Sequence, residues 1–556
     1  MPRPAARDHS LYFTNPKYAF VPPPELLGDS TLHDVVVVGG GPVGLTAALE
    51  LARHGIRCVL LDDKDTLNDG SRAICIARHS LEIMQQLGLS DRFVAKGLGW
   101  THGTSYYGTR PVYRLEMPHS PDERFYPMYN LQQQYIEQFL VDAAARSPMI
   151  ELRWRNRLSG IELGDSGATL TVDTPAGSYR LRSRYVLAAD GARSAVRHLL
   201  GLKLRGDAYE GRYVIVDIRM ASNFPTERRA FFDPPANPGA TVLIHKQPDD
   251  IWRVDYQLRD GESEDDALRE DNIRRRVGAI LDMIGEKAPW ELEWWSLYKA
   301  YSLALDDYRC GPVLFVGDAA HLVPIFGVRG LNSGLADAMN AAWKLAYVIK
   351  ELAPQKLLDS YSIERRGATL DVFSNAAKST RFMTPPTRGY QLLRNAALSL
   401  AVHHDATRPL INPRQSRPYS YTDSPLTAFA ARDHDFAAGP VAGAPLSNRL
   451  LSADRFLLDR LGVGFSGLYF CETGELPPGV QNLFLDLAVG SEAFAPIVIS
   501  RHERGTPLAA AAGTFAAYGA TDGTFYLVRP DRHVAARWRQ IVPDEVRHAF
   551  MQSLGH

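Results

Sequence analysis

The fold is decided by residues 33–62, which read HDVVVVGGGPVGLTAALELARHGIRCVLLD. The four valines at positions 35–38 predict a short strand buried on both faces of a parallel sheet. The segment from Pro42 to His54 has the pattern of a helix that ends at Gly55, and residues 56–62 predict a second buried strand. These elements form a β-α-β unit, so the sequence predicts an α/β fold of the Rossmann type.

The turn before the helix carries Gly39, Gly41 and Gly44, which is the GxGxxG pattern of dinucleotide-binding folds. The first glycine permits the tight turn, the second lets the backbone approach a pyrophosphate, and the third allows close helix packing. Such sites also need an acidic residue about 20 positions further on to hold a ribose hydroxyl, and Asp62 ends the second strand. Asp63 is a second candidate for this role. The motif predicts a bound NAD or FAD.

A second segment favours FAD. In VLFVGDAAHLVPIFGVRGLNSG, residues 313–334, a predicted strand ends at Gly317 and Asp318, and a long helix from Ser333 to Leu352 follows the loop. A carboxylate at a strand end, next to a helix N-terminus, is suited to hold a ribityl chain and a phosphate.

Composition limits the class of protein. The chain has 556 residues, 45% of them hydrophobic and 22% charged, which predicts about three folded units and excludes a short binding module or a disordered chain. Its 62 basic and 63 acidic residues leave no excess of cations for nucleic acid. We expect no membrane partner and a cytoplasmic location, because no signal peptide or long apolar run is present. The four cysteines form no CxxC pair, so no metal site is expected.

Three segments carry a family resemblance: the GxGxxG turn, AADGARSAVR at 188–197 and GDAAH at 317–321. In this order they resemble the single-component FAD-dependent aromatic hydroxylases, the class A flavoprotein monooxygenases, over about residues 33–375. The resemblance implies hydroxylation of a phenolic substrate with NADH or NADPH and O2, through a flavin C4a-hydroperoxide. No second GxGxxG follows a buried strand, which argues against Baeyer–Villiger enzymes. The sequence also lacks a WxWxIP segment, which argues against a flavin-dependent halogenase.

The resemblance also implies which residues contact the cofactor. They are Gly39, Gly41, Pro42, Gly44, Asp62, Asp63, Arg72, Gln133, Asp190, Gly191, Gly317, Asp318, Gly330, Leu331 and Asn332. Arg72 is expected near the pyrophosphate, where an arginine can bridge phosphate oxygens; the alternative is a surface ion pair. Gln132 and Gln134 flank Gln133, so the glutamine that contacts the cofactor is open by one position. Asp190 has the alternative role of capping the helix that begins near residue 192.

The loop before the long helix is implied to lie beside the flavin. Pro324 matches the proline where oxygen reacts, and we expect His321 to support the loop by hydrogen bonding. Where the family often reads GQGxN, residues 327–332 read GVRGLN. Arg329 is therefore expected either to stabilise negative charge on the reduced flavin or to point to solvent.

The substrate domain is expected at residues 205–299, with an insertion at 98–128. Alternation in IWRVDYQL separates two faces, Trp252, Val254 and Tyr256 against Arg253, Asp255 and Gln257. We favour a core face and a solvent face; the alternative makes His245, Arg253 and Tyr256 contacts for a phenol or a carboxylate. VIVDIRM and AFFDPPANPG resemble hydroxyphenylpropionate hydroxylases, so the first substrate expectation is a meta-substituted phenol with an acidic side chain.

The predicted organisation has five parts. An N-terminal arm (1–32) precedes an FAD-binding domain (33–204 and 300–375) that is interleaved with a mixed β-sheet substrate domain; an irregular, partly helical connection (376–439) leads to residues 440–556. This last unit resembles the thioredoxin-like domain appended to phenol hydroxylases. Because Cys471 has no second thiol nearby, we expect it to be structural, for subunit contacts in a homodimer.

Two other functions remain open at this point. One is a flavin monooxygenase of polyketide or antibiotic tailoring, which hydroxylates or epoxidises a polycyclic substrate. The other is a flavin-binding sensor or assembly protein without turnover. The regiochemistry and the choice between NADH and NADPH are also open.

Overall fold

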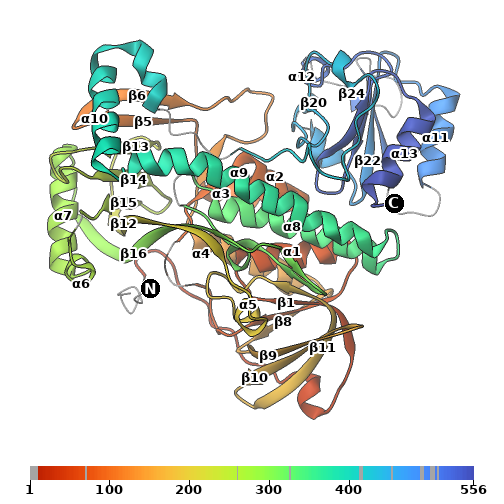
Figure 1. Ribbon diagram of the computed structural model, residues 1–556, viewed down its shortest axis with the longest axis horizontal. Coiled ribbons are helices and arrows are strands. Elements are labelled where there is room, and N and C mark those ends of the chain that lie inside the picture. The colour runs from red at the N-terminus through yellow and green to blue at the C-terminus, as the bar shows by residue number, and fades with distance from the viewer. Residues whose placement is uncertain are drawn as a thin grey trace.

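The computed structural model describes residues 10–68, 70, 72–259, 261–324, 327–411, 417–452, 455–488, 494–500, 508–509 and 513–556. Figure 1 shows one sheet below, a second sheet to the left and a C-terminal domain to the right. The long helices α8 (Gly330–Ile349) and α9 (Asp359–Met383) run between them. The N-terminal arm lies over the lower sheet, where Tyr18 stacks on Trp154 with ring centroids 4.2 Å apart.

The lower sheet contains the predicted β-α-β unit. Strand β1 (Leu32–Val38) leads through α1 (Pro42–Arg53) into β2 (Cys58–Asp62), and the two strands are parallel. The strand order is β17-β18-β11-β1-β2-β8, and a β9-β10 hairpin extends β11. The other strands are β8 (Ile150–Trp154), β9 (Arg157–Gly164), β10 (Gly167–Thr174), β11 (Gly177–Ala188), β17 (Arg309–Cys310) and β18 (Val313–Phe315). The predicted Rossmann-like fold is confirmed.

The register of this sheet brings three predicted motifs to one edge. Val38 of β1 pairs with Ala188 of β11, and Ala188 pairs with Phe315 of β18. The glycine turn, the Asp190 segment and the Gly317 segment follow these residues within one or two positions. Ligands of such sheets bind outside the carboxyl ends of the strands, so this edge is the expected cofactor site.

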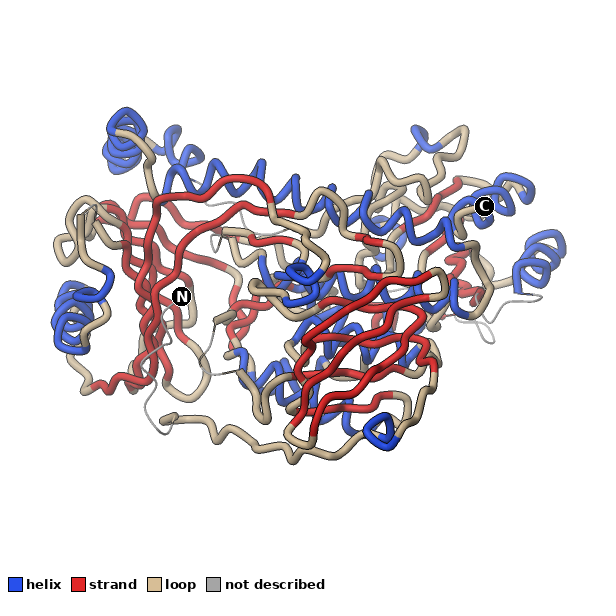
Figure 2. The backbone as a smooth tube through the Cα atoms, turned by 60° about the horizontal axis from the view of Figure 1, so that its bottom comes forward, coloured by secondary structure: helices blue, strands red, loops and turns tan. Residues whose placement is uncertain are grey.

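The second sheet has the order β19-β16-β12-β15-β14-β13-β5-β6 and is mostly antiparallel (Figure 2). Its strands are β5 (His102–Tyr107), β6 (Arg110–Glu116), β12 (Arg205–Met220), β13 (Arg228–Phe232), β14 (Thr241–Lys246), β15 (Ile251–Gln257), β16 (Trp290–Ala304) and β19 (His321–Leu322). The predicted insertion supplies β5 and β6. Helices α6 (Glu264–Ala267) and α7 (Glu270–Met283) cover its outer face.

Smaller elements join the two sheets. A three-stranded sheet, β3-β7-β4, consists of β3 (Cys75–Ala77), β4 (Leu98–Trp100) and β7 (Met128–Asn130). The helices around the lower sheet are α2 (Arg78–Gln86), α3 (Ser90–Lys96), α4 (Gln133–Arg146) and α5 (Ala195–Leu199). The predicted connection contains α10 (Arg388–His403). No helix within the described ranges is long and apolar enough to cross a membrane.

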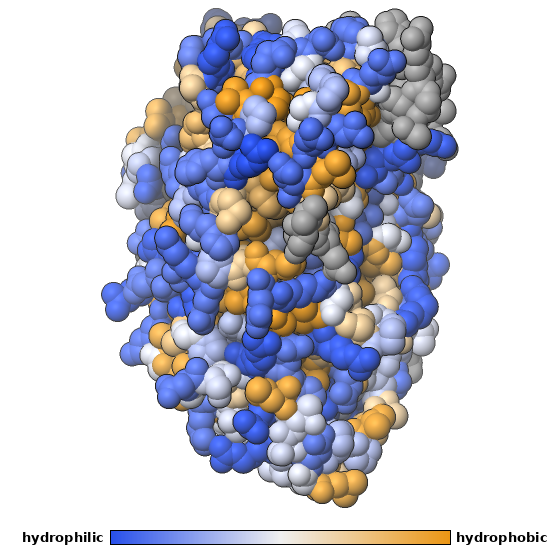
Figure 3. Space-filling view, turned by 90° about the vertical axis from the view of Figure 1, so that its right-hand side faces the viewer, coloured by the Kyte–Doolittle hydropathy of each residue, from blue (hydrophilic) through white to orange (hydrophobic). Residues whose placement is uncertain are grey.

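The C-terminal domain is built on a five-stranded sheet in the order β24-β23-β22-β25-β26. Its elements are β22 (Phe465–Cys471), α11 (Pro478–Ala488), β23 (Phe494–Ser500), β24 (Leu508–Ala509), α12 (Thr514–Ala517), β25 (Phe525–Val528), β26 (Val534–Trp538) and α13 (Pro543–Ser553), preceded by the hairpin β20 (Leu450–Ser452) and β21 (Arg455–Phe456). On the side of the molecule that carries this domain, apolar side chains gather along the middle of a mostly hydrophilic surface (Figure 3). The thioredoxin-like assignment stays a prediction.

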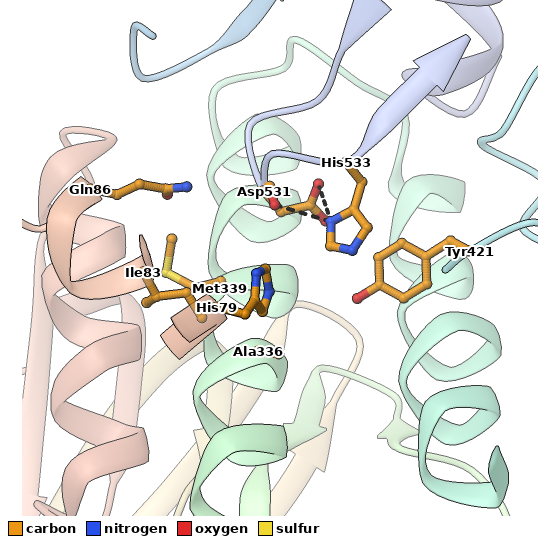
Figure 4. A pocket seen from close by; sticks show the side chains of 8 residues that line it. All are labelled: His79, Ile83, Gln86, Ala336, Met339, Tyr421, Asp531 and His533. Carbon is orange, nitrogen blue, oxygen red and sulfur yellow. Dashed lines mark hydrogen bonds and ion pairs between the residues drawn. The ribbon is translucent and has the colours of Figure 1, made fainter. Parts of the chain in front are cut away.

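Two further findings concern this domain. Cys471 is only 2% exposed inside its own sheet, so its expected structural role fits, but this side chain is not available for subunit contacts. The domain also packs on α8, because Phe465 lies edge-on to Trp343, with ring centroids 6.0 Å apart. Beside this contact, Asp531 and His533 reach a small pocket whose other side is lined by α2 and α8 (Figure 4).

Candidate functional site

The glycine turn leaves room for a ligand at one position only. A Cβ on Gly39 would lie 2.5 Å from the carbonyl oxygen of Ala189, and a Cβ on Gly44 would lie 2.0 Å from the carbonyl oxygen of Gly39. These two glycines are therefore required by close packing. Around Gly41, in contrast, no atom lies within 4 Å of a Cβ position. This open side, at the N-terminus of α1, fits the pyrophosphate of a dinucleotide.

Asp62 holds the turn from the neighbouring strand. Its Oδ2 accepts a hydrogen bond from the Gly40 amide at 2.7 Å, and its Oδ1 accepts one from the Lys64 amide at 2.9 Å. Burial raises the pKa of this carboxyl. Asp63 is exposed. Asp62 is thus placed at the glycine turn, as the ribose role requires, and both residues remain proposed ribose ligands.

Asp318 lies at the same edge in an unusual environment. Its side chain is exposed, yet the surrounding protein raises the pKa of its carboxyl by burial, while His321, Arg72 and Arg197 act in the opposite direction. Arg197 is fixed beside this carboxyl, because its guanidinium donates to the carbonyl oxygens of Ala319 and Ala192 at 2.9 and 2.6 Å. A carboxylate and a guanidinium at this end of the strands suit the polar chain of a flavin.

Asp190 shows the geometry of a helix cap. Its Oδ2 accepts a hydrogen bond from the Val196 amide at 3.0 Å, at the start of α5. Its Oδ1, however, is buried and has no hydrogen-bond partner among the described residues. Burial raises the pKa of this carboxyl. The capping alternative is therefore observed, and the second oxygen is left for a ligand at the strand-end edge, next to Gly191.

A buried network that sequence reasoning missed fixes the loop after β18. Asp337 of α8 accepts from the Gly317 amide at 3.0 Å, from His321 Nε2 at 2.7 Å and from Arg365 Nε at 2.6 Å. Burial alone would raise the pKa of Asp337, but Arg365 and His321 outweigh it and hold this pKa below its usual value. His321 therefore supports the loop, as expected. The available signal was a lone acidic residue within the apolar segment of the predicted long helix.

The start of α8 is tied to the segment that carries Arg72. Asn332 accepts from the Ala77 amide at 2.9 Å and donates to the carbonyl oxygen of Val328 at 2.6 Å, so it acts here as a structural link. Gly330 and Leu331 begin the helix beside it, and Pro324 is buried in the preceding loop. Arg329 is 4% exposed, so its solvent-facing alternative is wrong. Its Nη1 donates to the carbonyl oxygen of Val372 in α9 at 2.9 Å.

Gln133 is the glutamine whose side chain reaches the Arg72 turn. It begins α4, and its Oε1 accepts from the Ala73 amide at 3.1 Å. Gln132 instead donates to the carbonyl oxygen of Pro248 at 2.8 Å, and Gln134 accepts from Tyr12 at 3.1 Å. The geometry therefore favours the predicted register.

The second sheet turns a polar face toward the Arg72 segment. Pairing across the strands forms one row, which consists of Gly103, Arg228, His245, Arg253, Asp217 and Trp294. Arg253 is held by Asp217 through two hydrogen bonds of 2.8 Å, and its Nη1 donates to the carbonyl oxygen of Arg72 at 3.2 Å. The expected solvent face is therefore wrong, because the Arg72 segment covers it and these side chains are buried.

Tyr256 lies on the opposite face of the same sheet. It packs in the cluster formed with α7, which contains Trp252 and Val254, and Arg276 lies over its ring at 5.3 Å from the centroid. The core-face prediction is confirmed for these three residues of β15. As a contact for a phenol or a carboxylate, Tyr256 was wrongly grouped with His245 and Arg253, because successive residues of a strand point to opposite faces.

A strand-end dinucleotide site next to a buried polar sheet face defines a flavin-binding protein of two interleaved domains. Residues 33–376 match the family described as FAD binding domain, and the chain belongs to this family. It is 31% identical over 372 residues to the 3-(3-hydroxy-phenyl)propionate/3-hydroxycinnamic acid hydroxylase of Mycobacterium sp. (strain JLS), covering 66% of this chain and 63% of that protein. It is 29% identical over 378 residues to the para-nitrophenol 4-monooxygenase of Pseudomonas sp. (strain WBC-3), covering 66% and 91%.

Solved structures share the fold. The flavin-dependent monooxygenase PieE, in complex with FAD and substrate, superposes with a TM-score of 0.75 at 24% identity, covering 94% of this chain and 100% of that chain. The p-nitrophenol 4-monooxygenase PnpA from Pseudomonas putida DLL-E4 superposes with a TM-score of 0.61 at 26% identity, covering 69% and 97%. PieE thus also covers the C-terminal domain, which lies beyond the family match.

Proposed function

We propose that this chain is an FAD-dependent monooxygenase that hydroxylates a phenolic aromatic substrate with NADH or NADPH and O2. The observation that carries the proposal is the buried polar face of the second sheet, which lies against the Arg72 segment beside the strand-end site. A second support is the family, whose relatives include enzymes named for hydroxylation of a hydroxyphenylpropionate and of p-nitrophenol.

The residues at the strand-end edge fit FAD. The open side of Gly41 and the α1 N-terminus would hold the diphosphate, with Asp62 at the ribose, while Asp318 and Arg197 would hold the chain that leads to the flavin ring. When bound, FAD accepts a hydride from NADH or NADPH and activates O2 for transfer of one oxygen atom to the aromatic ring.

The chain itself contributes position, water exclusion and charge. The Asp337 network holds the loop that ends at Pro324. The α8 N-terminus, which begins at Gly330, carries the partial positive charge of a 20-residue helix and stabilises negative charge nearby. Arg253 keeps the covering segment closed over the sheet face through its bond to Arg72. We propose His245 as a substrate contact. We also propose that the positive charge of Arg329 stabilises negative charge on the reduced flavin.

The test is turnover by the purified, FAD-loaded protein. NADH and NADPH oxidation and O2 uptake are measured with and without a panel of phenols that includes 3-(3-hydroxyphenyl)propionate and p-nitrophenol, and products are analysed by mass spectrometry. A phenol that accelerates oxidation and gains one oxygen atom supports the proposal. Acceleration that yields only hydrogen peroxide directs the search to larger rings. If no addition makes either nicotinamide reduce the flavin, the monooxygenase assignment fails.

The proposal extends to the assembly. A homodimer stays a prediction, which light scattering of the purified protein tests directly.

A further inference from the structure

Arg365 of α9 connects the cofactor edge to the C-terminal part of the chain. Its side chain is buried, and its three nitrogens donate to three different residues. Nε donates to Asp337 at 2.6 Å, and Nη1 donates to the Tyr421 hydroxyl at 2.9 Å. Nη2 donates to the carbonyl oxygen of Ser333, in the first turn of α8, at 3.2 Å. A planar guanidinium that is bonded on all sides fixes its partners relative to one another.

At the cofactor end, Asp337 orients the turn that precedes Asp318. The Asp337 carboxylate accepts a hydrogen bond of 3.0 Å from the Gly317 amide. Gly317 has a φ of 59°, and a Cβ at this position would lie 3.1 Å from the Val43 side chain of α1. The turn is thus packed against the helix of the glycine motif, and Asp318 follows it directly. A displacement of Asp337 therefore moves the proposed contact of the flavin chain.

At the other end, the C-terminal domain holds the Tyr421 ring. This side chain is 2% exposed, packs on His533 with ring centroids 4.3 Å apart, and lies 5.0 Å from the Arg529 guanidinium. Figure 4 shows the rings of Tyr421 and His533 side by side. The Tyr421 amide also donates to the carbonyl oxygen of Gly443 at 2.8 Å. The position of the Tyr421 hydroxyl therefore depends on the docked domain.

Other contacts dock the domain without this hydroxyl. Glu364, the residue before Arg365, accepts from Arg529, and Phe465 packs against Trp343 of α8. Two adjacent residues of α9 thus have different partners: Glu364 ties the helix to the domain, whereas Arg365 leads from Tyr421 to the cofactor loop. Loss of the Tyr421 hydroxyl removes the second connection and leaves the first in place.

We propose that Tyr421 is a positioning residue for the cofactor: acting through Arg365 and Asp337, it holds the Gly317 turn, so that docking of the C-terminal domain strengthens FAD binding. Without the hydroxyl, one N–H of the buried guanidinium loses its acceptor, and Arg365 turns away from Asp337 to recover one. The cost falls on the FAD-bound state, because only bound FAD requires one fixed position of Asp318. By linkage, FAD equally strengthens the docking of the domain.

Tyr419 provides a matched control. It lies two residues before Tyr421, with ring centroids 5.9 Å apart, and its hydroxyl makes no hydrogen bond within the described part of the chain. Tyr421→Phe and Tyr419→Phe therefore remove the same atom from the same segment, and only the first change breaks the bond to Arg365.

The first experiment dilutes the FAD-loaded protein and follows FAD release by flavin fluorescence, which gives the dissociation constant. Tyr421→Phe should raise this constant about 5- to 150-fold, the range of typical coupling free energies, and Tyr419→Phe should leave it unchanged. The melting temperature is also measured with and without added FAD. The increase that FAD produces should be smaller in Tyr421→Phe, whereas a purely structural role would lower both melting temperatures alike.

The second experiment measures the reciprocal effect on the domain. In the unmodified protein, added FAD should slow the proteolytic separation of the C-terminal domain, and Tyr421→Phe should lose this protection. Because no nicotinamide or phenol is present, neither measurement depends on the proposed turnover.

Four results would overturn the proposal. They are an unchanged dissociation constant in Tyr421→Phe, an equal increase in Tyr419→Phe, proteolysis of the unmodified protein that FAD does not slow, and failure of Tyr421→Phe to fold. The last result counts because the domain must dock and the chain must fold without the hydroxyl if its role is to position the cofactor.

Discussion

The interface between the C-terminal domain and the helices α8 and α9 should depend on one arginine. Arg529 donates to both oxygens of Glu364 in α9 at 2.5 and 2.9 Å, and to both oxygens of Asp531 at 3.1 and 2.7 Å. Lys344 of α8 completes the cluster, 2.6 Å from Glu364. All four groups are buried, and together they are electrically neutral.

The substitution Arg529→Met leaves two buried carboxylates with a single lysine. Removing one partner of a buried ion pair costs about 3–5 kcal/mol, because an uncompensated charge remains in a poorly hydrated site. Burial would raise the pKa of Glu364, but Arg529 and Lys344 hold it well below its usual value, so much of this stabilisation depends on Arg529. We expect a loss in this range in the free energy of unfolding, and faster proteolytic separation of the C-terminal domain.

The assay is urea unfolding followed by tryptophan fluorescence, because Trp343 lies 5.4 Å from the Arg529 guanidinium. Arg547→Met is the control: Arg547 pairs with Asp486 at 2.7 Å on the surface, where such a pair contributes about 0–1 kcal/mol. The reasoning would be refuted if Arg529→Met lost no more stability than Arg547→Met while the domains remained joined.

Three further predictions follow from the described geometry. Gly44→Ala should abolish the FAD absorbance of the purified protein, because its Cβ would lie 2.0 Å from the Gly39 carbonyl oxygen; retention of FAD would contradict the tight-turn argument. Burial would raise the pKa of Glu50, but Arg53 lowers it to about 2, so its stabilisation is complete above its ordinary pKa of 4.5 and is lost as the pH falls toward 2; Glu50→Gln should flatten this part of an acid-unfolding curve. Burial raises the pKa of Asp255, on the same sheet face as Arg253, to about 7. Asp255 therefore gains negative charge as the pH rises through 7, and binding of an aromatic acid should weaken over this range; if Asp255→Asn showed the same loss of binding, Asp255 would be excluded as its cause.

Local sequence patterns predicted helices and strands, whereas contacts between distant segments decided which of their faces are buried. The β-α-β unit and the strand that precedes Gly317 could be predicted because periodicity and glycine turns are properties of short stretches. The alternation of β15 also predicted which residues share a face. It could not tell which segment covers that face, because the covering residues around Arg72 lie 181 positions away from Arg253. The buried face was therefore mistaken for a solvent face.

The site residues show the same division. The glycines, Asp62 and Asp318 follow strands in a recognisable pattern, and the structure places them at one edge. Asp337 was marked only by its place in an apolar helix segment, and Arg365 carried no signal, since a charge on a predicted helix is usually exposed; only the fold brings them to His321. Arg529 and Glu364 are 165 positions apart, so the sequence offered no reason to pair them.

The two buried charge clusters of this chain differ in a way that separates structure from function. At the domain interface, every charge of the Arg529 cluster faces a counter-charge. On the sheet face, Arg228 and atoms of His245 and Asp255 lack partners among the described residues. Each unpartnered buried polar group costs about 1–3 kcal/mol, so a face that retains several of them is less stable than an apolar one. A ligand that supplied the missing acceptors and donors would remove this cost, and for this reason we propose the unpaired face, and not the paired cluster, as the place where substrate binds.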